Sequence, residues 1–170
     1  MGIIGYGQTG RKTAEIAGVF GMKVLIYTRH PKKEEETEML QFVSMEDVLR
    51  QSDVVSLHCP LTEETRFLID ENALNCMKKG AILINTSRGP LVDEEALSRV
   101  LKEKRIMAAG LDVLCEEPMR KDHPLLGLSN CVITPHIAWA TKECREHLMD
   151  MVEKNLEAFL HGEPQNVLVE

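Results

Sequence analysis

The sequence predicts an α/β protein with a doubly wound parallel sheet, and three observations lead to this fold class. Short apolar runs alternate with amphipathic stretches along the whole chain. The runs are continuously apolar, which is typical of parallel strands that helices cover on both faces. A glycine-rich turn, Gly5-Tyr6-Gly7-Gln8-Thr9-Gly10, separates the first run from the first amphipathic stretch. This order is that of a β-α-β-α protein with a ligand-binding turn after its first strand.

Six apolar runs are the expected strands, and they comprise residues 2–5, 24–27, 54–58, 81–85, 107–113 and 132–134. Helix starts are indicated between them. Ser44 and Asp47 form a capping-box pattern, and Asp70, Asp93 and Thr141 stand where N-caps are expected. The charged run over residues 32–38 predicts the solvated start of another helix.

A longer helix is expected over residues 141–161. Its apolar residues recur at spacings of three and four, which predicts one buried stripe; they are Cys144, Leu148, Met151 or Val152, Leu156 and Phe159. Gly162, Glu163 and Pro164 should end this helix, and residues 165–170 should form a short tail.

Composition limits the possible classes of protein. A chain of 170 residues with 44% hydrophobic residues is the size of one domain. The net charge of −7 argues against a nucleic-acid partner, which requires a clustered basic face. No segment is apolar enough to span a membrane, and the first residues lack the basic start of a signal peptide. The five cysteines show no metal-ligand spacing, so we expect reduced thiols, no metal and a cytoplasmic location.

The glycine-rich turn predicts a dinucleotide site. Gly5, Gly7 and Gly10 would allow a tight turn and a close approach of the backbone to a pyrophosphate, and the following helix would present its N-terminus. The G-x-G-x-x-G pattern alone is a weak signal, because glycine-rich turns are common. Its position between a strand and a helix makes the interpretation much stronger.

The end of the second strand bears on the choice of cofactor. NAD-binding domains usually place a carboxylate there to hold the ribose 2′-hydroxyl, whereas this chain has Thr28, Arg29 and His30. Arg29 would attract a 2′-phosphate, which favours NADP over NAD. The alternative is that Arg29, His30, Lys32 and Lys33 are merely solvated turn residues.

Three further strand ends carry polar groups. Arg88 follows the strand at 81–85, Asp112 and Glu117 follow the strand at 107–113, and His136 follows the last strand. In open α/β sheets, ligands bind at the carboxyl ends of the strands. Taken singly, Arg88 could form a surface salt bridge and His136 could be an ordinary loop residue. Their joint position at one edge favours a catalytic site.

These segments together resemble the cofactor domain of the D-isomer-specific 2-hydroxyacid dehydrogenases, a Rossmann-type fold. The matching motifs are Gly5-Tyr6-Gly7-Gln8-Thr9-Gly10, His58-Cys59-Pro60-Leu61-Thr62 with Thr65, Asn85-Thr86-Ser87-Arg88-Gly89, Gly110-Leu111-Asp112-Val113 with Glu117-Pro118, and Thr134-Pro135-His136. They occur in order, and the resemblance extends over essentially the whole chain. The family's separate substrate domain is not among the matched segments, so we expect a fragment or a truncated product.

The resemblance implies roles for individual residues. Arg88 would orient the substrate carboxylate, His136 would be the general acid/base, and Glu117 would be the partner of His136. An imidazolium is well suited to protonate a carbonyl oxygen near neutral pH, and a neighbouring carboxylate favours the protonated ring. The residues implied in cofactor binding are Gln8 and Thr9 at the pyrophosphate, Thr28, Arg29 and His30 at the adenosine ribose, Cys59, Pro60 and Thr86 along the dinucleotide, and Asp112 near the nicotinamide.

Trp139, three residues after His136, resembles the glycerate dehydrogenase and hydroxypyruvate or glyoxylate reductase branch, and is a candidate for substrate specificity. Its alternative roles are helix-start packing or a subunit contact. We expect residues 1–140 to form the NAD(P)-binding domain, and residues 141–170 to pack towards the substrate domain of a homodimer. Two other functions stay open: a dinucleotide-binding module like the C-terminal-binding-protein corepressors, and a remnant that binds cofactor without catalysis.

Overall fold

The computed structural model describes residues 1–167 and divides into two compact units, Met1–Pro135 and His136–Glu170. The end of the expected tail, residues 168–170, lies outside the described residues. The break between the units falls after Pro135, five positions before the domain boundary expected at residue 140. The expected division of the chain into residues 1–140 and 141–170 stays a prediction.

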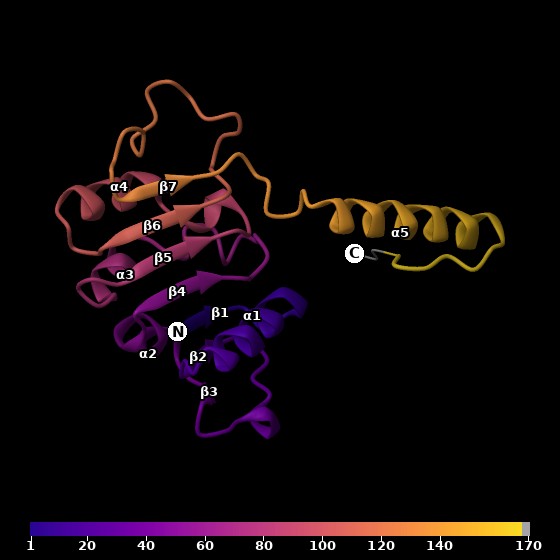
Figure 1. Cartoon of the computed structure of the whole chain (residues 1–170), viewed down its shortest axis with the longest axis horizontal. Coiled ribbons are helices and arrows are strands. Elements are labelled where there is room, and N and C mark those ends of the chain that lie inside the picture. Colours follow the sequence, from indigo (N-terminus) through magenta and orange to yellow (C-terminus); the bar gives the residue numbers. More distant parts are fainter. Residues whose placement is uncertain (168–170) are drawn as a thin grey trace. The chain divides into compact units, whose positions relative to one another are not determined.

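The first unit contains one parallel sheet (Figure 1). Within residues 1–167 its strands are β1 (Gly2–Ile4), β2 (Val24–Tyr27), β3 (Leu40–Phe42), β4 (Val54–Leu57), β5 (Ile82–Asn85), β6 (Ala108–Leu111) and β7 (Cys131–Ile133). Their order is β3-β2-β1-β4-β5-β6-β7, and every neighbouring pair is parallel. The chain reverses its direction of travel across the sheet between β1 and β4, so the doubly wound fold is confirmed.

Helices cover the sheet because successive strand residues point to opposite faces. Ile4, on β1, belongs to the larger core with α2 (Met45–Gln51), α3 (Glu71–Cys76) and α4 (Glu94–Lys102). Its neighbour Ile3 belongs to a separate core with α1 (Gln8–Val19). The alternation places α1 on one face of the sheet and the other three helices on the opposite face.

The predicted helix caps are confirmed. The side chain of Ser44 accepts a hydrogen bond from the Asp47 N–H, that of Asp70 from Ala73, and that of Asp93 from Ala96. Each of these bonds satisfies a backbone N–H that has no partner inside its helix, typically worth about 1 kcal/mol. These local bonds determine where three of the helices begin.

The expected helix over residues 32–38 is wrong. Lys33–Glu35 forms a single 3-10 turn, and the chain then enters β3, a strand that was not predicted from the sequence. Glu36 accepts a hydrogen bond from the Phe42 N–H, and the Thr37 hydroxyl accepts from the Leu40 N–H. Such bonds from side chains to nearby backbone compete with a helix, so the chain folds back as an edge strand.

The prediction that both faces of every strand are covered also needs correction. It is confirmed over β1, where both Ile3 and Ile4 are buried. On β5, however, Ile82 and Ile84 are only half-buried, and Val132 on β7 is 66% exposed. An apolar run thus indicates a strand, but it does not tell which strands are covered on both faces, since β5 is an inner strand of the sheet.

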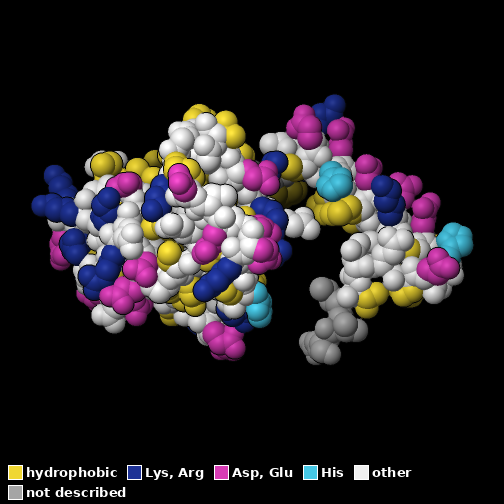
Figure 2. Space-filling model, turned by 90° about the horizontal axis from the view of Figure 1, so that it is seen from below, with side chains coloured by type: hydrophobic (Ala, Val, Ile, Leu, Met, Phe, Trp, Pro, Cys, Tyr) yellow, Lys and Arg dark blue, Asp and Glu magenta, His cyan; other side chains and the backbone are white. Residues whose placement is uncertain are grey.

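The second unit is built around α5 (Lys142–Leu160), which confirms the predicted long helix and its N-cap at Thr141. The buried stripe predicted for this helix is wrong for the described residues: most of its apolar side chains are exposed, from 40% for Met151 to 73% for Leu160, because α5 is the one helix described in its unit. Yellow hydrophobic atoms are therefore visible on this unit in Figure 2. In the described part of the chain, no helix is long and apolar enough to cross a membrane.

Candidate active site

The glycine-rich turn joins β1 to α1, as the sequence predicted. Gly5 has φ +97°, a conformation that side chains rarely adopt, and a Cβ atom there would lie 2.5 Å from the Cys59 nitrogen. A Cβ atom on Gly10 would lie 2.2 Å from the Gly5 oxygen. Gly7, the N-cap of α1, faces open space. Two glycines thus permit close packing of the turn, and the third leaves its outer side accessible to a ligand.

The N-terminus of α1 suits an anion. Gly7 offers no side-chain cap, and no acidic residue occurs in the first turn of α1. The first backbone N–H groups of a helix lack partners within the helix and carry the positive end of its dipole. A pyrophosphate could therefore accept hydrogen bonds from the turn at Gln8 and Thr9, which are both exposed.

A pocket of about 350 Å³ opens beside this turn. Its lining includes Gly5, Gly7, Thr28, Arg29, His30, Cys59 and Pro60 from the predicted cofactor site. It also includes residues that were not predicted from the sequence to belong to the site, namely Tyr6, Lys32, His58, Glu64, Thr65 and Leu68. The position of His58 at the end of β4 was the signal that could have identified it. The ends of β1, β2 and β4 therefore meet around one pocket.

Charge in the pocket is concentrated at the end of β2. Arg29 lies 3.7 Å from the Glu64 carboxylate, and Lys32 lies 3.8 Å from that of Glu35. Burial lowers the pKa of His58, whose ring is hydrogen-bonded to the Ser56 hydroxyl at 2.9 Å. Burial also raises the pKa of the Cys59 thiol. The inner wall is therefore uncharged near neutral pH, whereas Arg29 and Lys32 supply positive charge, balanced in part by carboxylates.

The turn after β5 is held by internal hydrogen bonds. The buried Asn85 amide donates to the Arg88 carbonyl and accepts from the Ser87 N–H, and the Ser87 hydroxyl donates to the Leu57 carbonyl. Arg88 itself is exposed, and one guanidinium nitrogen donates to the Ser87 carbonyl at 2.7 Å. Within residues 1–167 Arg88 forms no ion pair, so its remaining N–H groups could bind a carboxylate.

The loops that carry Arg88 and Glu117 meet at a close backbone contact. A Cβ atom on Gly89 would lie 1.9 Å from the Leu114 carbonyl carbon, so only glycine fits there. The Leu114 N–H in turn donates to the Glu117 carboxylate at 2.9 Å. Arg88 and Glu117 are thus carried by loops that pack directly against each other.

Asp112 and Thr134 connect the ends of the next two strands. Asp112 is buried at the end of β6, and its carboxylate accepts a hydrogen bond from the Thr134 hydroxyl beyond β7. This bond anchors the segment that leads to His136. Neither Asp112 nor Thr86 belongs to the lining of the pocket. The cofactor roles of these two residues, like those of the residues that line the pocket, stay predictions.

His136 opens the second unit with φ +53°, in the left-handed region. A residue other than glycine in this region is uncommon, and such strain is often found at functional sites. The indole N–H of Trp139 donates to the His136 carbonyl at 3.0 Å, so Trp139 supports the local backbone. His136 belongs to a different unit from Arg88 and Glu117. Their convergence therefore stays a prediction.

Comparison with known proteins now identifies the family. Residues 1–138 match the model of the D-isomer specific 2-hydroxyacid dehydrogenase NAD binding domain. The chain belongs to this family. It is 49% identical over 168 residues to a hydroxypyruvate reductase of Blautia hydrogenotrophica, and 47% identical over 170 residues to a glyoxylate reductase of Aeropyrum pernix. These alignments cover 99% of the chain but 52% and 51% of the relatives, so it spans about half of their length.

Solved structures support the same assignment. An acyclic imino acid reductase in complex with NADPH and D-Arg superposes with a TM-score of 0.88 at 42% identity, covering 99% of this chain and 53% of that one. The residues of this chain fit a nicotinamide dinucleotide. Gly7 leaves open space beside the first turn of α1, and the pocket extends over the ends of β1, β2 and β4. The resemblance inferred from the motifs is therefore confirmed at the level of the family and the fold.

Proposed function

We propose that this chain is the cofactor-binding half of an oxidoreductase that interconverts a small 2-keto acid and its 2-hydroxy acid, with hydroxypyruvate or glyoxylate as the keto substrate. The observation that carries the proposal is the glycine-rich turn with its pocket, on the same edge of the sheet as Arg88 and Glu117. The similarity to hydroxypyruvate and glyoxylate reductases over nearly the whole chain supports this substrate class.

Each residue has a chemical role in this proposal. NAD(P)H, when bound, supplies the hydride. Gly5, Gly7 and Gly10 let the backbone approach the pyrophosphate, and Arg88 binds the substrate carboxylate with charge-assisted hydrogen bonds. His136 donates a proton to the carbonyl oxygen during reduction and accepts it during oxidation. Glu117 stabilises the protonated imidazole, and the buried Asp112 holds the segment that precedes His136 through Thr134.

The first prediction concerns the chain by itself. We expect it to bind NADPH or NADH but to reduce hydroxypyruvate negligibly, because one domain cannot close a cleft that aligns the keto acid and excludes water. Cofactor fluorescence measures the binding, and loss of absorbance at the nicotinamide band measures turnover. Turnover near ~10 per second, typical of ordinary enzymes, would contradict this prediction.

A chimera tests whether this chain supports turnover when it is joined to the other half of a relative. It joins the chain to the complementary half of the Blautia hydrogenotrophica hydroxypyruvate reductase, of which 52% is already matched by this chain. We expect the chimera to reduce hydroxypyruvate with either reduced cofactor. A folded chimera that binds cofactor but turns over neither hydroxypyruvate nor glyoxylate would overturn the proposed function.

The second prediction is a preference for NADPH over NADH. Arg29, His30 and Lys32 line the pocket where a 2′-phosphate would lie, and Thr28 replaces the carboxylate that favours NAD. One charge-assisted bond from Arg29 is worth roughly 1.5 to 3 kcal/mol, or about tenfold or more in affinity. Titration of the chain with both reduced cofactors measures the ratio of dissociation constants.

Two variants sharpen this measurement. Arg29→Ser should abolish the preference, whereas Glu64→Gln should increase it, because Glu64 lies 3.7 Å from Arg29 and would repel a phosphate. Arg50→Ser, on α2 and outside the pocket lining, is the matched control for loss of a positive charge. Equal or tighter binding of NADH by the unmodified chain would refute the NADP assignment.

A further inference from the structure

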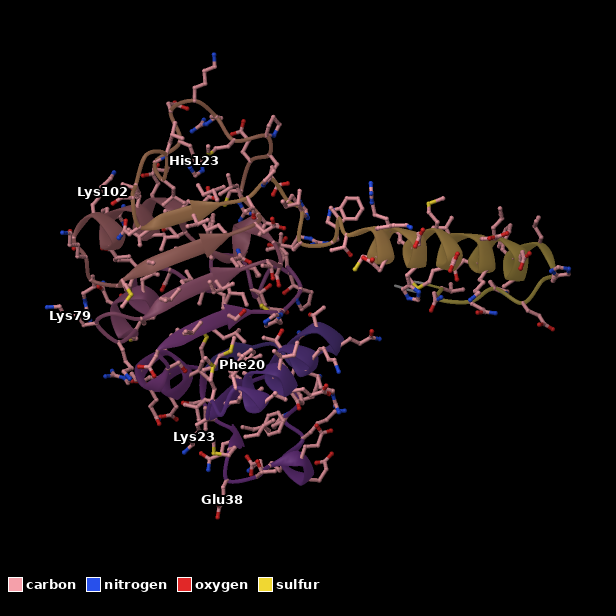
Figure 3. All side chains as sticks on the ribbon, in the orientation of Figure 1. Phe20, Lys23, Glu38, Lys79, Lys102 and His123 are labelled. Carbon is pink, nitrogen blue, oxygen red and sulfur yellow. The ribbon has the colours of Figure 1, made fainter. Side chains whose placement is uncertain are left out.

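A largely buried contact between Glu94 and His123 lies next to the candidate site, on the helix that follows the Arg88 turn. Glu94 is the first residue of α4, and its side chain is only 12% exposed. One carboxylate oxygen accepts a hydrogen bond from the Cys115 N–H at 2.8 Å, and the other lies 3.1 Å from Nε2 of His123. His123 is buried in the segment between β6 and β7 (Figure 3). Glu94 therefore touches both ends of the loop over residues 115–123.

The orientation of the His123 ring follows from its second contact. Its Nδ1 atom accepts a hydrogen bond from the Leu125 N–H at 3.3 Å, so Nε2 is the nitrogen that donates to Glu94. The Ser98 hydroxyl, one turn further along α4, donates to the Pro124 carbonyl at 2.8 Å. Helix α4 thus holds the far end of the loop at two successive points.

The near end of the loop connects Glu94 to Arg88 and Glu117, the two candidate catalytic groups of the first unit. The Cys115 N–H and the Leu114 carbonyl belong to one peptide unit. Glu94 binds this unit on its N–H side, and Gly89, the neighbour of Arg88, packs against its carbonyl side. The preceding amide, that of Leu114, donates to Glu117. A rotation of this peptide would move Glu117 relative to Arg88.

The exposed part of the loop around Arg120 is held by weak ion pairs. Residues 115–118 and 120–122 are exposed, and Arg120 makes only long ion pairs, at 3.5 Å, with Glu116 and Asp122. Exposed pairs of this kind contribute little to stability. The largely buried carboxylate of Glu94 restrains both ends of this loop, and hydrogen bonds to a charged group are about twice as strong as neutral ones.

We propose that Glu94 is a positioning residue of the candidate active site: its carboxylate holds the Leu114–Cys115 peptide and His123, and thereby fixes Glu117 relative to Arg88. The proposal rests on the proposed function only in that Glu117 has a catalytic role there. The holding contact itself can be tested on the chain without any turnover. Glu95, which is exposed in the same helical turn, offers a control with the same change of charge.

The main experiment compares Glu94→Ala with Glu95→Ala by amide hydrogen exchange, resolved by NMR for Leu114, Cys115 and Leu125. Losing one restraining hydrogen bond should speed exchange of these amides by about tenfold or more in Glu94→Ala and leave Glu95→Ala unchanged. Exchange in Glu94→Ala that equals that of Glu95→Ala would overturn the proposal.

A conservative variant, Glu94→Gln, distinguishes loss of the contact from unfolding of the chain. Glu94→Gln keeps one oxygen that can accept from the Cys115 N–H, but it turns an NH₂ group towards the donating Nε2 of His123. We expect faster exchange at Leu125 and retained protection at Cys115. Equal protection at both ends, or a loss at both ends that Glu95→Gln shares, would contradict the proposed contact.

The thiol of Cys115 reports the charge of Glu94 independently. Partial burial of the thiol, followed by the nearby Glu94 carboxylate, raises the pKa of Cys115 to about 12. Glu94→Gln should lower this pKa, so that alkylation of Cys115 at pH 8, followed by peptide mass spectrometry, becomes about tenfold faster or more. Glu95→Gln should alkylate at the rate of the unmodified chain. Unchanged reactivity of Cys115 in Glu94→Gln would count against the contact.

In the chimera, Glu94→Ala should lower kcat for hydroxypyruvate about tenfold or more, with an unchanged KM for the cofactor. The alkaline limb of reduction should also move to lower pH, because a displaced Glu117 stabilises the protonated His136 less. Intact kcat and pH profile, despite faster loop exchange, would refute the positioning role. A chimera without any turnover would instead defeat the proposed function, and the exchange and alkylation results would still decide the contact.

Discussion

Gly10→Ala should remove measurable dinucleotide binding and destabilise the first unit. The new Cβ atom would lie 2.2 Å from the Gly5 oxygen and 3.2 Å from the His58 side chain, so α1 must move away from the turn. Overpacking of this kind typically costs about 1–3 kcal/mol of folding free energy. The displaced helix N-terminus would no longer hold a pyrophosphate, and we expect affinity to fall about 100-fold or more. Denaturant unfolding and cofactor fluorescence measure the two effects.

Two other glycines separate these effects. Gly7→Ala should leave stability nearly unchanged, because nothing lies within 4 Å of the new Cβ atom, yet it should weaken dinucleotide binding where the ligand approaches. Gly18→Ala, in the same helix and also in open space, should retain binding and stabilise α1 by about 0.5–1 kcal/mol. Full cofactor affinity in both Gly7→Ala and Gly10→Ala would place the dinucleotide elsewhere.

His136→Asn in the chimera should reduce kcat for hydroxypyruvate by about 10² to 10⁴, the usual contribution of a general acid/base. Asparagine tolerates the left-handed backbone that His136 adopts at φ +53°, so the local fold should survive. Cofactor affinity should be unchanged, because the glycine turn and its pocket belong to the first unit. Steady-state rates with saturating cofactor measure the loss.

His147→Asn is the matched control for this substitution, since His147 is exposed on α5 in the same unit. It should retain the full kcat. A His136→Asn chimera with more than about half of the original kcat would show that another group supplies the proton, and the catalytic assignment of His136 would be wrong.

Local interactions account for the features that the sequence predicted well. The apolar runs became β1, β2 and β4 to β7, because a strand buried in a parallel sheet needs apolar side chains along its length. Ser44, Asp70, Asp93 and Thr141 cap their helices because the side chain and the amide it satisfies are only three residues apart. Where two local patterns competed, as over residues 32–38, the prediction failed and β3 was missed.

The sequence by itself thus determined the family, the order of strands and helices along the chain, and the glycine turn, because each depends on motifs or on neighbours within a few residues. Only the tertiary structure decided that Lys32, His58 and Glu64 join one pocket, that Gly89 packs on Leu114, and that Glu94 reaches both Cys115 and His123. The two contacts of Glu94 join residues 21 and 29 positions apart in the chain. They arise from which strands are neighbours in the sheet, and no local pattern of residues encodes that arrangement.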